Sequence, residues 1–71
     1  MRTGRDALWR VIYIARGEAQ ALQIEELLRQ AGFMVDQRRL PSAGGRLEDI
    51  EIKALDAEAE EARLFLMEQG L

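Results

Sequence analysis

The chain has 71 residues, of which 48% are hydrophobic and 32% are charged, and its formal net charge is −3. A chain of this length has room for one hydrophobic core, and its composition is typical of a folded globular protein rather than a disordered one. The absence of cysteine and histidine excludes disulfides, thiol catalysis and the two commonest ligands of a structural zinc ion. Because so small a core supplies only about 3–5 kcal/mol of stability, we expect self-association.

The first residues differ in character from the rest of the chain. Residues 1–7 show no hydrophobic periodicity, and we expect them to be a flexible leader in front of one domain that covers residues 8–71. Residues 8–16 are rich in β-branched and aromatic side chains, which predicts a largely buried strand. Gly17 ends that pattern.

A helix is predicted at residues 18–31. Ala21, Ile24, Leu28 and Ala31 recur at helical spacing and form one apolar face, while most other positions are polar. Gly32 then stands where many helices end in a left-handed residue.

Two further strands are predicted at residues 33–39 and 47–54, and the turn-forming residues 41–45 join them as a hairpin. Ile50, Ile52 and Ala54 alternate with charged residues, so one face of the last strand should be buried and the other wet.

The second helix is predicted to begin after Asp56, whose carboxylate we expect to accept hydrogen bonds from the first backbone amides of that helix. Gly70 marks its end. The side chains expected to enter the core from this helix are those of Ala59, Ala62, Phe65 and Leu66.

This order of elements predicts an α+β domain with a ferredoxin-like βαββα arrangement. A split crossover inserts the third strand between the first two, which gives a three-stranded sheet of order 1-3-2 with two helices on one face. The usual fourth strand of that fold is missing, so the first strand is expected to be an open edge.

The uncovered face of this sheet is predicted to carry apolar side chains. If Trp9, Val11 and Tyr13 point toward the helices, other apolar residues of the first strand flank Arg10 on the uncovered face. The opposite phase exposes Trp9, Val11 and Tyr13 instead, and both phases remain open. Our preferred interpretation is a homodimer or partner-protein interface, the alternative being that the leader, the hairpin loop or the chain end covers the patch. The residues predicted for this interface are Leu8, Arg10, Ile12, Ile14 and Met34.

The hairpin loop at residues 41–46 offers a second candidate site. Glycine amides and nearby guanidinium groups are suited to bind a phosphate or carboxylate, which suggests a small-ligand sensor for an anion or nucleotide. The simpler interpretation is a turn that uses glycine for its backbone conformation. The candidate anion-binding residues are Arg38, Arg39, Gly44, Gly45 and Arg46.

Other functional classes find little support in the sequence. Neither Ser42 nor Thr3 has a histidine to activate it, so we expect no catalytic residues, no enzyme activity and no cofactor. Overall acidity argues against nucleic-acid binding, and no apolar run is long enough to span a membrane. The lack of an export signal favours a cytoplasmic location.

Short packing motifs run through the chain after residue 7. They are WRVIYIA at 9–15, EAQA at 18–21, LLRQAGF at 27–33, IEI at 50–52 and AEEAR at 59–63. Together they resemble a small prokaryotic domain family of unknown function whose members are described as signal-transducing proteins, and especially its short Firmicutes members, sometimes mislabelled glutamate decarboxylase.

The resemblance implies a ferredoxin-like fold and no catalytic residues. A pyridoxal enzyme needs a Schiff-base lysine inside a large cofactor fold, whereas Lys53, the only lysine, lies on a predicted strand of a very small domain. Family members typically have proline where this chain has Leu55, and Pro-Asn or a similar pair where it has Arg16-Gly17. These differences alter turns rather than the core.

Overall fold

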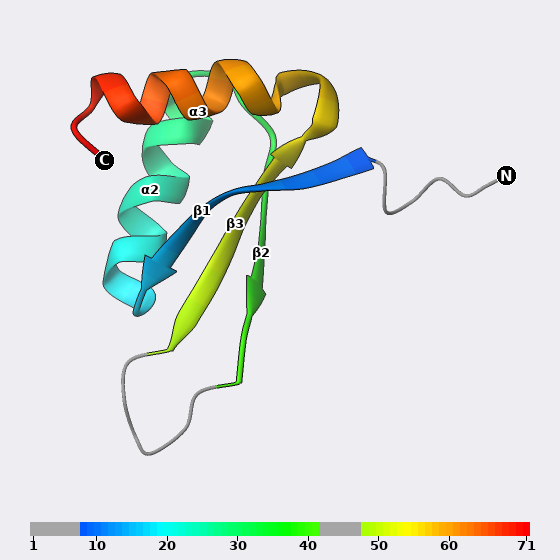
Figure 1. Ribbon diagram of the computed structural model, residues 1–71. Helices are drawn as coiled ribbons and strands as arrows, with labels where there is room; N and C mark the ends of the chain where they lie inside the picture. Colours follow the sequence, from blue (N-terminus) through cyan, green and yellow to red (C-terminus); the bar gives the residue numbers. More distant parts are fainter. Residues whose placement is uncertain (1–7, 42–47) are drawn as a thin grey trace, which may run out of the picture.

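The computed structural model describes residues 8–41 and 48–71, so the predicted leader and residues 42–47 of the hairpin loop lie outside the described part. The order of elements is βαββα, as predicted (Figure 1). The elements are β1 (Trp9–Arg16), α2 (Glu18–Gln30), β2 (Val35–Arg39), β3 (Asp49–Leu55), a short 3-10 helix (Asp56–Glu58) and α3 (Ala59–Glu68).

The three strands form one antiparallel sheet in the order β1-β3-β2, which confirms the predicted topology. β3 is the central strand and β1 and β2 are the two edges (Figure 1). Ile50, Ile52 and Ala54 of β3 have 0% of their surface exposed, while the residues between them are half-buried. The alternation seen in the sequence therefore marks the inner and outer faces of the sheet.

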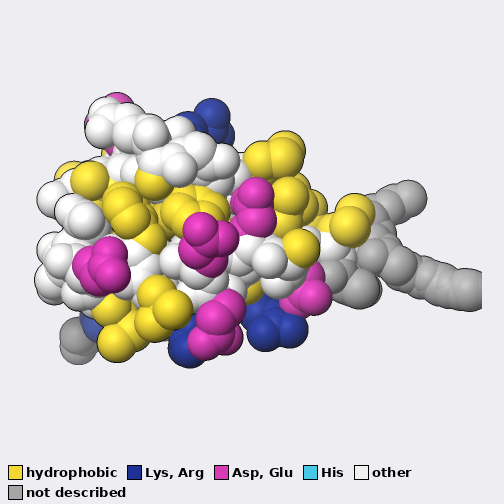
Figure 2. Space-filling model, turned by 90° about the horizontal axis from the view of Figure 1, so that it is seen from above, with side chains coloured by type: hydrophobic (Ala, Val, Ile, Leu, Met, Phe, Trp, Pro, Cys, Tyr) yellow, Lys and Arg dark blue, Asp and Glu magenta, His cyan; other side chains and the backbone are white. Residues whose placement is uncertain are grey.

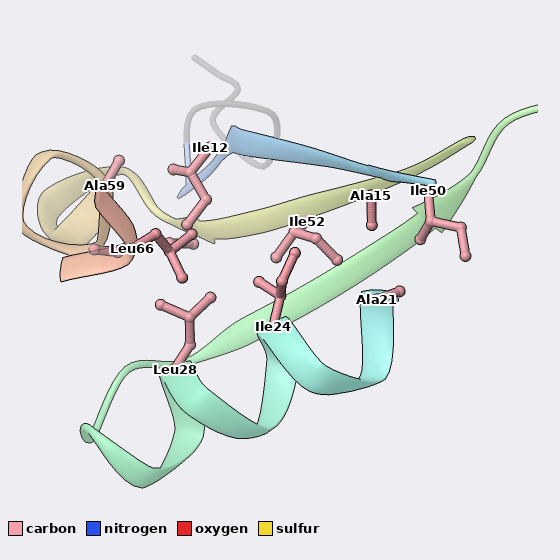
Figure 3. Packing of buried hydrophobic residues seen from close by; sticks show 11 residues of the cluster. Ile12, Ala15, Ala21, Ile24, Leu28, Ile50, Ile52, Ala59 and Leu66 are labelled. Carbon is pink, nitrogen blue, oxygen red and sulfur yellow. The ribbon is translucent and has the colours of Figure 1, made fainter. Parts of the chain in front are cut away.

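Both helices contribute to a single core on the inner face. Figure 3 shows Ile24 and Leu28 of α2 pointing at the sheet, with Leu66 of α3 reaching the same space. Ala59 and Ala62 are the other buried residues of α3, and their small side chains permit close packing. Ala31, which was predicted to join this core, lies beyond the end of α2 and is exposed.

A β-bulge interrupts β1 and decides which of its side chains enter the core. Val11 is opposite Lys53 and Tyr13 is opposite Ile52, so Ile12 is the extra residue in the pairing. Ile12 is consequently turned toward the helices and is only 8% exposed. The prediction that Ile12 belongs to an exposed interface is therefore wrong, because neither uniform strand phase applies to β1.

Each helix is followed by a glycine with positive φ, at the position that the sequence predicts. After α2, Gly32 has φ +95° and the Phe33 amide donates to the Leu28 carbonyl at 3.0 Å. The same pattern follows α3, where the Leu71 amide donates to the Leu66 carbonyl at 3.0 Å. These bonds satisfy carbonyls that a helix end leaves free, and they draw an apolar residue back toward the core.

The beginning of α3 differs from the prediction. Asp56 makes no side-chain capping hydrogen bond, and residues 56–58 form a 3-10 turn instead of the first turn of the α-helix. The Asp56 carboxylate pairs with the Arg10 guanidinium of β1 at 2.7 Å. The Asp56 carboxylate, which was expected to cap the helix, thus binds Arg10 of β1 instead.

Candidate functional site

The side of the sheet turned away from the helices, termed the open face, is the first candidate site. Residues directly opposite each other in an antiparallel pair point to the same side, so the register identifies this face. Since Ile50, Ile52 and Ala54 face the helices, the intervening residues of β3 and their partners face away. The open face consists of Trp9, Val11, Ile14 and Arg16 from β1, Asp49, Glu51, Lys53 and Leu55 from β3, and Asp36 and Arg38 from β2.

The β1 side of the open face is apolar. Val11 is 39% exposed, Ile14 is 43% exposed, and Trp9 stands opposite Leu55. None of these side chains has a described element packed over it, because α2 and α3 contact the inner face. Apolar side chains gathered in this way on a small protein commonly mark a surface that binds another molecule.

The remainder of the open face carries charges of both signs. Arg16 pairs with Asp49 at 3.0 Å, Lys53 stands opposite Asp36, and Glu51 stands opposite Arg38. Acids and bases are equal in number in these three pairs, although the whole chain has a net charge of −3. The open face therefore has no net charge that would repel a second copy of itself.

The residues predicted for the interface do not all lie on this face. Leu8 and Met34 are 55% and 58% exposed, and Ile14 lies on the open face as predicted. Arg10 stands opposite Ala54, on the helix side of the sheet, where it reaches Asp56. Ile12 is buried.

Three apolar residues of the open face were absent from the predicted set. Trp9 and Val11 belong to the opposite strand phase, which the sequence left open, and Leu55 lies one residue beyond the predicted end of the last strand. A bulge lets β1 expose Val11 and Ile14 together, although they are three residues apart.

The outer edge of β1 is obstructed. The Gly17 amide donates to the Glu48 carbonyl at 2.7 Å. Because backbone direction alternates along an antiparallel strand, the N–H and C=O groups of Arg16, one residue earlier, point away from β3. There the Arg16 amide donates to Oε1 of Gln20 at 2.6 Å. This side-chain bond and the bulge at Ile12 both disturb the regular row of donors and acceptors that an added strand would need.

The outer edge of β2 has no comparable obstruction among the described residues. The Leu40 amide donates to the Asp49 carbonyl at 2.9 Å, so Leu40 turns its backbone toward β3. Because backbone direction alternates along an antiparallel strand, Val35, Gln37 and Arg39 turn their N–H and C=O groups outward. We term these outward groups the β2 edge.

A groove of about 560 Å³ lies between β2 and α2, next to the β2 edge. Its polar side chains are already paired, since Gln37 donates to Glu25 at 2.5 Å and the Arg39 guanidinium binds both Glu18 and Glu48. The hydrogen bond and charge of Glu18, followed by the charge of Glu48, raise the pKa of Arg39 above its ordinary value. The groove is lined by Glu18, Ala19, Leu22, Glu25, Gln37 and Arg39.

The candidate anion-binding residues are not brought together in the described part of the chain. Arg38 faces the open side of the sheet and Arg39 faces the helix side, because adjacent residues of a strand point in opposite directions. Arg39 is occupied by two carboxylates. Gly44, Gly45 and Arg46 lie outside the described residues.

A second, smaller hollow lies against α3, where the Phe33 and Phe65 rings pack with centroids 6.0 Å apart. Leu64 on the outer side of α3 is 49% exposed. Viewed from above in Figure 2, hydrophobic and acidic side chains are interspersed on this side of the molecule.

Within residues 8–41 and 48–71, no three or more metal-ligating side chains are grouped closely enough to hold an ion. The described helices include none with the length and apolar character needed to cross a membrane.

Comparison of the chain with protein-family models, curated proteins and solved structures gives no match. The resemblance to the signal-transducing family therefore stays a prediction, and functional inference depends on the geometry of the sheet.

Proposed function

We propose that this protein is a non-catalytic binding or regulatory module that self-associates through the sheet surfaces its helices leave uncovered. The observation that carries the proposal is the open face, where Trp9, Val11, Ile14 and Leu55 form an apolar area without a described cover. Burial of such area provides about 25 cal/mol per Å² toward association.

The size of the domain supports this proposal. Eleven described apolar residues form the core, and five of these are alanines. A core of this size gives modest stability, and a chain without cysteine or histidine has good packing or self-association as its sources of further stability. The resemblance to the signal-transducing family supports a regulatory role, and the sequence supports a non-catalytic one because it has no histidine or cysteine to form a nucleophile–base pair.

Light scattering coupled to size-exclusion chromatography tests self-association. The expected result is a mass that rises from one chain toward two as the concentration is raised from micromolar to millimolar. Amide chemical shifts recorded over the same range should change for residues of β1, β2 and β3, and much less for the outer side of α3. A mass of one chain throughout, with unchanged shifts, would contradict the proposal.

A further inference from the structure

The two edges of the sheet differ in their capacity to accept another strand. At β1, the Gln20 side chain occupies the Arg16 amide and a bulge interrupts the strand at Ile12. At β2, the outward groups of Val35, Gln37 and Arg39 face no described strand. Strand addition requires a regular row of backbone groups without partners, and among the described residues β2 offers such a row.

We propose that β2 pairs antiparallel with β2 of a second copy, in a register centred on Gln37. This inference rests on the self-association proposed above and assigns the contact to the β2 edge, so the apolar β1 side of the open face stays uncovered at the far edge of each sheet. Val35 of one copy lies opposite Arg39 of the other, and Gln37 lies opposite Gln37. These are the residues whose backbone groups point outward, so the register supplies hydrogen-bonded pairs at all three positions. The resulting two-fold symmetry closes the assembly at two copies.

Charge complementarity selects this register. It places Asp36 opposite Arg38 of the second copy, and the symmetry repeats the contact, which gives two pairs of opposite charge. Both side chains are exposed, and the structure gives neither an ion pair with a described residue.

Alternative registers lose this complementarity. The neighbouring registers that keep the backbone hydrogen bonds are displaced by two residues. One of them brings Asp36 opposite Asp36 of the second copy, and the other brings Arg38 opposite Arg38. A parallel pairing of β2 with itself also sets like charges side by side. Like charges directly opposite each other on a sheet are destabilising, so the register centred on Gln37 is the favoured one.

The proposed pairing joins two sheets into one of six strands with β2 and its copy at the centre. The open faces of the two copies then form one continuous surface, because the paired strands share their inner and outer sides. On the helix side, Val35 of the second copy lies near the mouth of the groove that contains Leu22 and Arg39. β2 has five residues, so we expect a reversible dimer.

The experiment uses reciprocal charge substitutions in the full chain, analysed by sedimentation or light scattering. Asp36→Arg alone puts arginines opposite each other, and Arg38→Asp alone puts aspartates opposite each other. Each should raise the concentration at which half of the chains are dimeric by about tenfold or more, since two favourable charge pairs become two unfavourable ones. The double variant Asp36→Arg/Arg38→Asp should dimerise like the original chain. An equimolar mixture of the two single variants should form the mixed dimer, because its pairs are again opposite in sign.

A matched control distinguishes an effect on dimerisation from an effect on the folding of a single chain. Asp36 also stands opposite Lys53 on β3, so a change at Asp36 disturbs a cross-strand pair within one chain. Lys53→Glu disturbs the same pair without changing the charges at the β2 edge, and it should leave the dimer intact. Circular dichroism of each variant confirms that the chain is folded.

The outcomes also distinguish this inference from the broader proposal. If the original chain associates and both single variants associate equally well, the β2 pairing is wrong while self-association stands. Loss of the dimer in Ile14→Glu together with its persistence in Asp36→Arg would assign association to the open face. A chain that is monomeric at every concentration would contradict both proposals.

Discussion

Replacement of Leu28 by alanine tests the packing on which the whole sheet arrangement depends. The Leu28 side chain is 0% exposed and points from α2 toward the sheet, next to Leu66 of α3 (Figure 3). Loss of three buried carbon groups at about 0.8 kcal/mol each costs about 2.4 kcal/mol before any cavity is counted. With the cavity, the expected loss is about 2–5 kcal/mol, which is most of the stability of a domain this small.

Leu22→Ala is the matched control, since it is the same substitution on the same helix at a side chain that is 56% exposed. It should cost less than about 1 kcal/mol, partly offset by the higher helix propensity of alanine. Urea denaturation followed by circular dichroism gives both values, at one concentration well below any association midpoint. A difference of less than about 1 kcal/mol between the two variants would refute the described orientation of α2.

Three further substitutions test local features of the fold by the same denaturation assay. Gly17→Ala should cost about 1–3 kcal/mol, because φ +93° and ψ +164° are strained for any residue with a side chain, and an unchanged stability would contradict that backbone. Asp56→Asn should cost less than about 1 kcal/mol at low salt and even less at high salt, since its ion pair with Arg10 is solvent-exposed. Phe65→Leu should cost about 0.5–1.5 kcal/mol through loss of the ring contact with Phe33, and a neutral effect would argue against that contact.

The fold was largely predictable because its main signals are local. The alternation of apolar and charged residues in β3 predicts the buried side of this central strand, and the apolar positions of α2 recur at helical spacing. Gly32 and Gly70 marked helix ends because few other residues adopt positive φ without strain. Element order then left few topologies, since β1 and β2 need a strand between them to form an antiparallel sheet.

The parts that were not predicted depend on contacts between distant residues. A uniform alternation along β1 cannot reveal that Ile12 is the extra residue of a bulge, because the bulge is defined by its pairing with β3. Asp56 has the composition of a helix cap, but Arg10 from another strand competes for its carboxylate. In contrast, strand alternation alone predicts that the side chains of Arg38 and Arg39 point to opposite sides of the sheet. This argues against assigning both to one anion site.

Charges on β2 have a second interpretation that the proposed experiment resolves. Edge strands often carry charged residues because these deter the addition of foreign strands. A purely protective role would be served by charges of one sign, whereas Asp36 and Arg38 have opposite signs and lie two positions apart on the same face. An antiparallel copy centred on Gln37 places an opposite charge against each of these two residues, and few other partners would do so. If the charges only protect the edge, the double variant and the mixture of single variants will associate no better than either single variant. Restored association in both would show that the two charges act as a pair across the two-fold axis.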